Sequence, residues 1–322
     1  MNQRFNSESS RAVLFPGQGS QFVGMAQDLV ESETLARDLF QTAGDLMGCD
    51  LVSLCSKGPQ DALNATDISQ PAIFVSSMAA LAVIENSGGA ALVESRATAG
   101  LSLGEYSALV YSGALTFEDA LKVVVARGRA MQEACDKTEG TMASILGIDL
   151  NAVREAVEEA SGEGIVAVAN VNATTQIVIS GEKAAVERAG ELAQEKGARR
   201  VIPLEVAGAY HSPLMSSATE TLKPILAELK INTPVVPFYA NVSGVRVSDP
   251  EEIRAGLIRQ VESPVLWEPT LQGLVSEGMS EVLEPGPGKV VAGLVRQVDR
   301  GIPTRSVLDK ESIEQLLEGT VS

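Results

Sequence analysis

The chain has few of the residues that build metal sites and disulfide frameworks. Its 322 residues include one histidine, His211, and three cysteines, Cys49, Cys55 and Cys135. The cysteines have no close CxxC-type spacing, which disfavours a zinc site, and their number disfavours a disulfide scaffold. We therefore expect no metal, and any acid–base chemistry by an imidazole must be carried out by His211.

Positive charge and long apolar runs are also scarce. Lys and Arg number 25 against 42 Asp and Glu, a formal net charge of −17, and such a chain repels the phosphate backbone of nucleic acids. No uninterrupted apolar run approaches the roughly 18 residues needed to span a bilayer. Residues 1–10 lack the apolar segment of a signal peptide and are expected to form a loose extension. Neither nucleic acid nor a membrane is expected as a partner.

Apolar residues are abundant, at 45% of the chain, and they follow an α/β pattern. A short strand is predicted at residues 12–15, directly before the turn PGQGS, and another at residues 96–99, before GLSLG. Helical periodicity is found in residues 35–47, 68–84, 105–111 and 117–135. Thr116, with Asp119 three residues later, is typical of an N-terminal cap for the last of these helices.

Residues 140–206 have a different order of elements. Strands are predicted at 142–148, 165–170, 176–180 and 199–206, and helices at 150–160 and 184–196. This βαββαβ order is that of a ferredoxin-like module. Alternation of strands and helices resumes after residue 207, with strands at 237–241, 281–283 and 303–307. We expect one discontinuous α/β core, residues 1–139 and 207–322, interrupted by a small subdomain at 140–206.

The segment Gly100-Leu101-Ser102-Leu103-Gly104 matches the G-x-S-x-G pattern of a nucleophile elbow. In such an elbow the serine lies on a sharp turn between a strand and a helix, beside backbone N–H groups that can stabilise an oxyanion. The predicted strand before it and the helix-forming residues after it favour this interpretation. An ordinary Gly/Ser turn remains the alternative, with Glu105 then serving as an acid of the kind favoured at a helix N-terminus.

His211 lies in the segment GAYHSP, where Pro213 suits the first position of a helix. A structural histidine is the ordinary interpretation of a single such residue. As the sole imidazole in a chain with a candidate serine nucleophile, however, His211 is our candidate base. Their spacing in the sequence does not establish that Ser102 and His211 meet, so their proximity is a hypothesis.

Two glycine-rich turns fail as nucleotide-binding motifs. In PGQGSQ, Phe22 stands where the last glycine of G-x-G-x-x-G would be. In PGPGK the glycine spacing is wrong for a phosphate loop, and Val290 follows the lysine. Either turn could be a simple chain reversal, while the first also suits an oxyanion hole.

Arg127 follows four apolar residues in the middle of a predicted helix. A buried guanidinium needs an anionic or polar partner, because desolvating it alone is costly. That partner is either a structural Asp or Glu or a ligand carboxylate held bidentately. Lys122 and Arg129, on the same helix, are expected to face solvent.

Several ordered segments of the chain carry a family resemblance. They are FPGQGSQFVGMAQDL, ISQPAIF, GLSLGEYSALV, RGRAMQEAC, ANVNATTQIVISG, AYHSPLM and EPGPGKVVAGLV. Together they resemble the malonyl-CoA:acyl carrier protein transacylases, the acyltransferase family of fatty acid and polyketide synthesis, over residues 12–308. The resemblance implies an α/β-hydrolase-like core with an inserted ferredoxin-like subdomain, in agreement with the pattern above.

The resemblance also implies roles for individual residues. Ser102 would be the nucleophile and His211 its base, with the backbone N–H groups of Gln18 and Leu103 as the oxyanion hole. Arg127 would bind the free carboxylate of a malonyl group.

The family's base is oriented by a main-chain carbonyl, which the resemblance assigns to Leu266. Asn170 and Asn172 would line the cleft. Many relatives have histidine directly before the serine, where this chain has Leu101, so no second imidazole competes with His211.

The implied reaction moves malonyl from malonyl-CoA to the phosphopantetheine thiol of acyl carrier protein, by ping-pong chemistry through a malonyl-serine. No cofactor is expected, because the thioester is a substrate and phosphopantetheine belongs to the partner. The family suggests a monomer in the bacterial cytoplasm, although a processed plastid protein also fits. A carrier from fatty acid or polyketide synthesis fits equally. Lys196, Arg199 and Arg200 are candidates for a local basic docking patch, and ordinary solvated residues are the alternative.

Two other classes compete with a transacylase. A serine hydrolase on an α/β-hydrolase body would need an acid between the serine and the histidine in chain order. Carboxylates exist in that interval, but many lie in the predicted insert. A non-catalytic acyl-binding or scaffold protein would not require Ser102, His211 and the glycine turns together.

Overall fold

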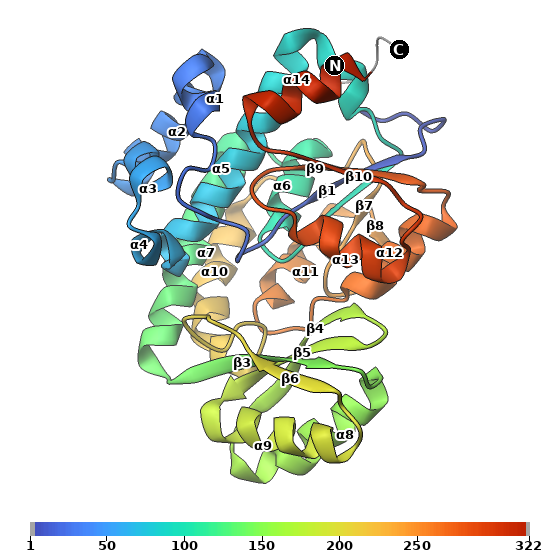
Figure 1. Ribbon diagram of the computed structural model, residues 1–322. Coiled ribbons are helices and arrows are strands. Elements are labelled where there is room, and N and C mark those ends of the chain that lie inside the picture. The colour runs from blue at the N-terminus through green and yellow to red at the C-terminus, as the bar shows by residue number, and fades with distance from the viewer. Residues whose placement is uncertain (1–3, 320–322) are drawn as a thin grey trace.

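The computed structural model describes residues 4–319 and contains two β-sheets (Figure 1). The larger sheet has the strand order β10-β9-β1-β2-β7-β8. Its strands are β1 (Arg11–Phe15), β2 (Ala97–Gly100), β7 (Phe238–Tyr239), β8 (Arg246–Val247), β9 (Glu281–Pro285) and β10 (Thr304–Val307). All pairs are parallel except β7 with β8. This sheet is the centre of the α/β core.

Fourteen α-helices surround the two sheets within the described residues. They are α1 (Gln27–Ser32), α2 (Thr34–Met47), α3 (Leu51–Lys57), α4 (Gln60–Asn64), α5 (Thr66–Ile84), α6 (Gly104–Tyr111), α7 (Phe117–Lys137), α8 (Leu150–Ala160), α9 (Lys183–Glu195), α10 (Ser216–Glu228), α11 (Pro250–Gln260), α12 (Trp267–Ser276), α13 (Val290–Val298) and α14 (Lys310–Glu318). Short helical turns lie at Glu85–Gly89, Ala90–Val93, Ser161–Glu163 and Pro213–Met215.

Helices α5 and α7 form the centre of the main hydrophobic core. Almost every residue of α5 is buried, and it packs against α7, α2 and α6. Residues 66–93 have the length and composition of a membrane-spanning helix, but 83% of the apolar window is buried inside the molecule. This segment is thus accounted for as a core helix. Helix α7 begins at the expected cap, because Thr116 Oγ1 accepts from the backbone N–H of Asp119 at 3.1 Å.

The smaller sheet is antiparallel, with the order β4-β5-β3-β6. Its strands are β3 (Gly140–Leu146), β4 (Val166–Ala173), β5 (Gln176–Glu182) and β6 (Arg200–Pro203). Helices α8 and α9 cover one face and enclose a separate apolar cluster. This part lies at the opposite end of the molecule from α14 (Figure 1). The predicted βαββαβ order of residues 140–206 is therefore present.

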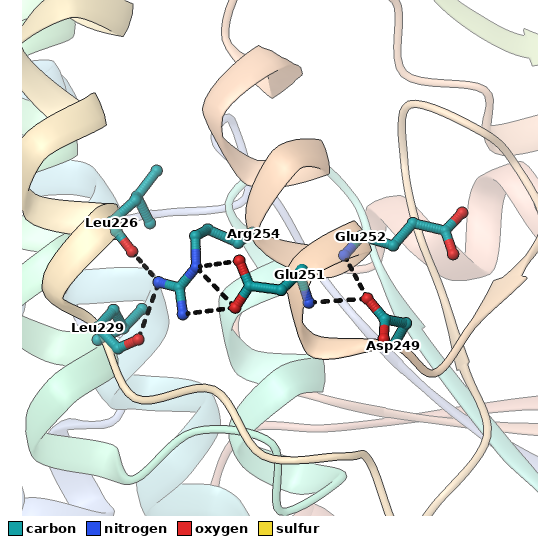
Figure 2. Close-up of polar contacts among 6 residues, drawn as sticks. All are labelled: Leu226, Leu229, Asp249, Glu251, Glu252 and Arg254. Atoms are coloured by element: carbon teal, nitrogen blue, oxygen red, sulfur yellow. Dashed lines mark hydrogen bonds and ion pairs between the residues drawn. The ribbon is translucent and has the colours of Figure 1, made fainter.

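Helix α11 is anchored through its first two turns, as Figure 2 shows. Asp249 Oδ1 accepts from the backbone N–H groups of Glu251 and Glu252 at 3.0 and 2.9 Å. Arg254 donates to the main-chain oxygens of Leu226 and Leu229 at the end of α10, the latter at 2.9 Å. Carbonyls at a helix C-terminus are natural partners for a cation. The position of α11 matters because its last residue belongs to the site.

The expectation of a loose extension at residues 1–10 is wrong for residues 4–10, and residues 1–3 lie outside the described part. Arg4 pairs with Glu85, with Nε 2.7 Å from Oε1. Phe5 forms a parallel bridge with Ser95, and the guanidinium of Arg4 lies 5.2 Å from the ring centre of Tyr111. The segment is fixed by these contacts, which have no signature in a short polar sequence.

Candidate active site

The carboxyl ends of the parallel strands meet at one edge of the larger sheet, and the candidate residues follow them. Parallel α/β sheets usually carry their sites at this edge. Strand β1 runs into the PGQGS turn, β2 into the GLSLG segment, and β7 is followed by Asn241. The PGQGS turn and the GLSLG segment therefore both lie at the carboxyl-terminal edge of the larger sheet.

Ser102 lies on a strained turn between β2 and α6. Its φ is 51°, in the left-handed region that non-glycine residues rarely adopt. A Cβ on Gly100 would lie 1.9 Å from the main-chain oxygen of Gly104, and one on Gly104 would lie 2.5 Å from that of Phe15. Both glycines are therefore required by close backbone approach. This geometry is that of a nucleophile elbow.

His211 meets Ser102 across the cleft. Its Nε2 lies 2.8 Å from Ser102 Oγ, and its Nδ1 lies 2.9 Å from the main-chain oxygen of Gln260. A carbonyl oxygen can only accept, so Nδ1 carries the proton and Nε2 presents its lone pair to the serine hydroxyl. The hypothesis that Ser102 and His211 meet is confirmed.

The expectation that Leu266 orients the histidine is wrong. The Leu266 main-chain oxygen accepts instead from Thr270, from its N–H at 3.2 Å and its hydroxyl at 2.9 Å. Leu266 immediately precedes α12, and its carbonyl is used in the first turn of that helix. The orienting carbonyl comes from Gln260, at the end of α11.

The imidazole is kept neutral by its surroundings. His211 is 4% exposed. Burial, followed by the positive charge of Arg127, lowers the pKa of His211 to about 4. The ring is therefore in its basic form throughout the neutral range.

Arg127 is buried, as the sequence predicted, and it reaches the nucleophile. Its Nη2 donates to Ser102 Oγ at 3.0 Å and to Gln260 Oε1 at 2.8 Å, and its Nη1 donates to Gln70 Oε1 at 2.6 Å. Its Nε is buried without a hydrogen-bond partner among the described residues. These three hydrogen bonds go to neutral groups, which leaves a cation beside the serine with unused capacity for an anion. Lys122 and Arg129 are exposed, as expected.

Glu105 is buried directly beneath the elbow. It is 3% exposed, and burial raises its pKa to about 7 despite hydrogen bonds from Asn241 and Gln260 and the nearby charge of Arg127. Its Oε1 accepts from the backbone N–H of Asn241 at 2.9 Å, and its Oε2 accepts from Gln260 Nε2. The carboxylate thus belongs to a buried polar network and does not serve as a solvated acid at the start of α6.

The PGQGS turn lies against the elbow. A Cβ on Gly17 would lie 2.3 Å from the main-chain oxygen of Leu101, so glycine permits the contact. Gln18 lines the cleft, and its side chain donates to Tyr210 Oη at 3.2 Å. Leu103 directly precedes α6. The backbone N–H groups of Gln18 and Leu103 therefore lie on the two segments that flank Ser102.

The cleft has a volume of about 930 Å³ and separates the larger sheet's edge from the smaller sheet. Asn170 and Asn172 on β4 both line it, and the buried Oδ1 of Asn172 has no hydrogen-bond partner in the described part of the chain. Apolar side chains complete the wall: Leu101, Met131, Met142, Val178, Leu204, Val206, Val290 and Leu294. Within residues 4–319, no three His, Cys, Asp or Glu side chains cluster as metal ligands would.

The basic residues considered for docking differ in availability. Lys196 pairs with Glu155 and Glu159, with Nζ 3.2 and 2.8 Å from their carboxylate oxygens. Arg199 and Arg200 are exposed beside it. The three therefore do not form one free basic patch.

Sequence reasoning missed the amide side chains of the site: Gln70, Asn241 and Gln260. Asn241 Oδ1 accepts from the N–H of Ser102, and Gln260 Nε2 donates to the main-chain oxygen of Ser102. Neither Asn241 nor Gln260 lies in a motif. Gln70 lies within ISQPAIF, directly before a proline inside α5, and this was the one available signal.

Comparisons with known proteins agree over nearly the whole chain. A family model described as acyl transferase domain matches residues 13–303. The malonyl CoA-acyl carrier protein transacylase of Bacillus subtilis (strain 168) is 44% identical over 311 residues, which cover 96% of this chain and 97% of that protein.

Solved structures give the same result. An acyl carrier protein S-malonyltransferase from Vibrio cholerae is 39% identical with a TM-score of 0.90, covering 96% of this chain and 100% of that one. A malonyl-transacylase solved with a type II PKS acyl-carrier protein is 38% identical with a TM-score of 0.90, and the match covers 97% of this chain and 100% of that one. The chain therefore belongs to the acyl transferase domain family. Within that family it groups with the malonyl CoA-acyl carrier protein transacylases.

Proposed function

We propose that this protein transfers the malonyl group from malonyl-CoA to the phosphopantetheine thiol of acyl carrier protein, through a malonyl ester of Ser102. One observation carries the proposal. Ser102 Oγ lies 2.8 Å from a neutral imidazole nitrogen and 3.0 Å from a buried guanidinium. A nucleophile, its base and a cation for the substrate's free carboxylate are thus within reach of one another.

The first half-reaction loads the enzyme. Ser102 Oγ attacks the thioester carbonyl as its proton passes to His211 Nε2, and the backbone N–H groups of Gln18 and Leu103 stabilise the tetrahedral oxyanion. The carbon–sulfur bond then breaks, and the departing sulfur of coenzyme A takes the proton from Nε2. A malonyl-serine ester and free coenzyme A remain.

The second half-reaction unloads it. The phosphopantetheine thiol gives its proton to Nε2, attacks the ester carbonyl, and passes through the same oxyanion site. The bond from carbon to Oγ breaks, and Ser102 recovers its proton from His211. The thiols of coenzyme A and of phosphopantetheine have similar acidity, so one thioester is exchanged for another and the overall equilibrium is close to balanced. No cofactor takes part.

Arg127 supplies acyl specificity. The free carboxylate of malonyl would give an ionic partner to a guanidinium whose three hydrogen bonds to described residues go to neutral groups. It would also offset the charge of Arg127, which adds to burial in lowering the pKa of His211, so binding of the correct acyl group would make the base stronger. Asn172, with its unpaired buried oxygen, and Asn170 would contact the bound substrate from the opposite wall.

We further infer the finer organisation of the molecule. Residues 1–139 and 207–322 would form an α/β-hydrolase-like catalytic core, and residues 140–206 a ferredoxin-like subdomain, with the cleft between them. The elbow after a parallel strand and the order β4-β5-β3-β6 support this division. The bacterial relatives support a cytoplasmic location, and a monomer would suffice because every proposed site residue comes from one chain.

The fate of malonyl-CoA with and without acyl carrier protein tests the function. A transacylase converts malonyl-CoA to malonyl carrier and releases little free malonate when the carrier is absent. A serine hydrolase releases malonate at full rate without the carrier, and that result would overturn the proposal. The site already argues against a hydrolase, because His211 Nδ1 faces a main-chain oxygen where a hydrolase would have an acid.

A further inference from the structure

The backbone of Ser102 is held on both sides by side-chain amides. Its N–H donates to Asn241 Oδ1 at 2.7 Å, and its main-chain oxygen accepts from Gln260 Nε2 at 2.9 Å. Asn241 Nδ2 also donates to the main-chain oxygen of Gly100 at 2.7 Å. A strained φ persists only where its surroundings hold it, and these two amides add to the backbone hydrogen bond that the Ser102 carbonyl accepts from the N–H of Glu105 at 3.1 Å.

Both residues are in turn held by one carboxylate, Asn241 through its backbone N–H and Gln260 through its side-chain amide. Glu105 Oε1 accepts from the N–H of Asn241 at 2.9 Å, and Glu105 Oε2 accepts from Gln260 Nε2. Asn241 and Gln260 are fully buried, so water does not replace these contacts. The carboxylate accepts at both oxygens, and so fixes the backbone position of Asn241 and the side-chain orientation of Gln260.

We infer that Glu105 is a positioning residue for the nucleophile: it holds the backbone of Asn241 and orients the side chain of Gln260, and these two residues hold Ser102 by its N–H and its carbonyl. This inference rests on the proposed function of Ser102. The hydrogen bonds of the Glu105 carboxylate go to these two residues and not to the reacting hydroxyl or the imidazole. Its effect on the chemistry therefore passes through the backbone of Asn241 and the side chain of Gln260.

Gln260 extends this effect to the other site residues. Its Oε1 accepts from Arg127 at 2.8 Å, and its main-chain oxygen accepts from His211 Nδ1 at 2.9 Å. If the amide of Gln260 turned over, its Nε2 would face the guanidinium, donor against donor. The Glu105 carboxylate favours the observed orientation, because only Nε2 can donate to it.

The experiment is single-turnover acylation of the full-length enzyme by saturating malonyl-CoA, with the half-saturating concentration and the unfolding midpoint measured in parallel. In Glu105→Gln, the new amide nitrogen would face either Gln260 Nε2 or the N–H of Asn241, donor against donor in both cases. We expect the acylation rate constant to fall roughly 30- to 100-fold, since a misplacement of about 1 Å has effects of this size. The half-saturating concentration of malonyl-CoA should change by less than about 3-fold, because Gln70 still holds Arg127, the proposed binding residue for the malonyl carboxylate.

A double exchange separates positioning from simple structural support. Glu105→Gln combined with Gln260→Glu restores a donor–acceptor pair and the buried charge, but the carboxylate introduced at position 260 would have no N–H for the Ser102 carbonyl. We therefore expect the unfolding midpoint to recover while acylation stays slow. Recovery of the rate together with the midpoint would overturn the inference.

Two further variants complete the test. Glu284 is a fully buried carboxylate that accepts from the N–H groups of Val291 and Ala292, so Glu284→Gln is the matched control and should lower stability with little change in acylation rate. Glu105→Asp keeps the charge but withdraws it by one methylene, and should fold yet acylate more slowly. Wild-type acylation rates in both Glu105→Gln and Glu105→Asp would overturn the inference about Glu105 and leave the proposed function intact. Absence of acylation in the wild-type enzyme would overturn the proposed function itself.

Discussion

His211 Nδ1 lies 2.9 Å from the main-chain oxygen of Gln260, and this contact makes Nε2 the basic nitrogen of the ring. A main-chain carbonyl carries no formal charge, so it fixes the tautomer without stabilising an imidazolium as strongly as a carboxylate would. Burial, and after it the charge of Arg127, lowers the pKa of His211 by more than the hydrogen bond to the Gln260 carbonyl raises it. The site thus holds a weak, correctly oriented base. Such a base suits acyl transfer from a thioester, because a thiol is a good leaving group.

A direct titration of His211 follows from this arrangement. Burial and a neighbouring cation both disfavour the charged ring, so the pKa shifts downward from 6.5 to about 4. Because His211 is the sole histidine, one imidazole signal in an NMR titration reports it without assignment. We expect the ring to be still neutral at about pH 5.5, and a midpoint near the ordinary value of 6.5 would contradict the electrostatic account.

Replacing Arg127 tests the source of acyl specificity. Arg127→Ala removes the only cation that contacts Ser102 Oγ, within the part of the chain that the structure describes. We expect kcat/KM for malonyl-CoA to fall about 100-fold, equivalent to about 3 kcal/mol, while some acetyl transfer is kept. Parallel assays with malonyl-CoA and acetyl-CoA measure this.

Arg129→Ala is the matched control, because Arg129 lies two residues further along α7 and is exposed. It should leave both activities unchanged. Equal loss of malonyl and acetyl transfer in Arg127→Ala would show that the guanidinium does not select the acyl group.

The elbow should tolerate no side chain at Gly100. A Cβ there would lie 1.9 Å from the main-chain oxygen of Gly104, so Gly100→Ala should lower the free energy of unfolding by at least about 3 kcal/mol. Gly256→Ala, in helix α11 with open space around the new methyl, should instead stabilise by about 1 kcal/mol. Urea unfolding of both variants checks this, and equal stability of the two would refute the close-packed elbow.

Carrier docking can be tested at the smaller sheet. Arg199 and Arg200 are exposed, whereas Lys196 is occupied by Glu155 and Glu159. If this surface receives an acidic carrier, Arg199→Glu with Arg200→Glu should raise KM for the carrier several-fold and leave KM for malonyl-CoA unchanged. Lys310→Glu, on α14 at the other end of the molecule, is the control. An unchanged KM for the carrier would exclude this surface.

The motif residues of the site were predictable from the sequence, because their chemistry imposes a local pattern. Glycines flank Ser102 where the backbone turns sharply, and Arg127 stands out as a charge among apolar residues. The partners of these residues were not predictable. Every residue has a main-chain carbonyl, so nothing in the sequence distinguishes Gln260 from Leu266 as the group that orients His211. Glutamine is common on surfaces, and its burial beside Arg127 depends on how α11 packs against α10.

The most direct test of the account is to trap the acyl-enzyme. The full-length protein is mixed with malonyl-CoA without carrier, quenched in acid, weighed intact and mapped by peptide mass. The account predicts one malonyl group per chain on Ser102, none in Ser102→Ala, much slower labelling in His211→Ala, and discharge of the wild-type ester by added carrier. A wild-type protein that carries no malonyl group, or carries it on another residue, would contradict the central claim.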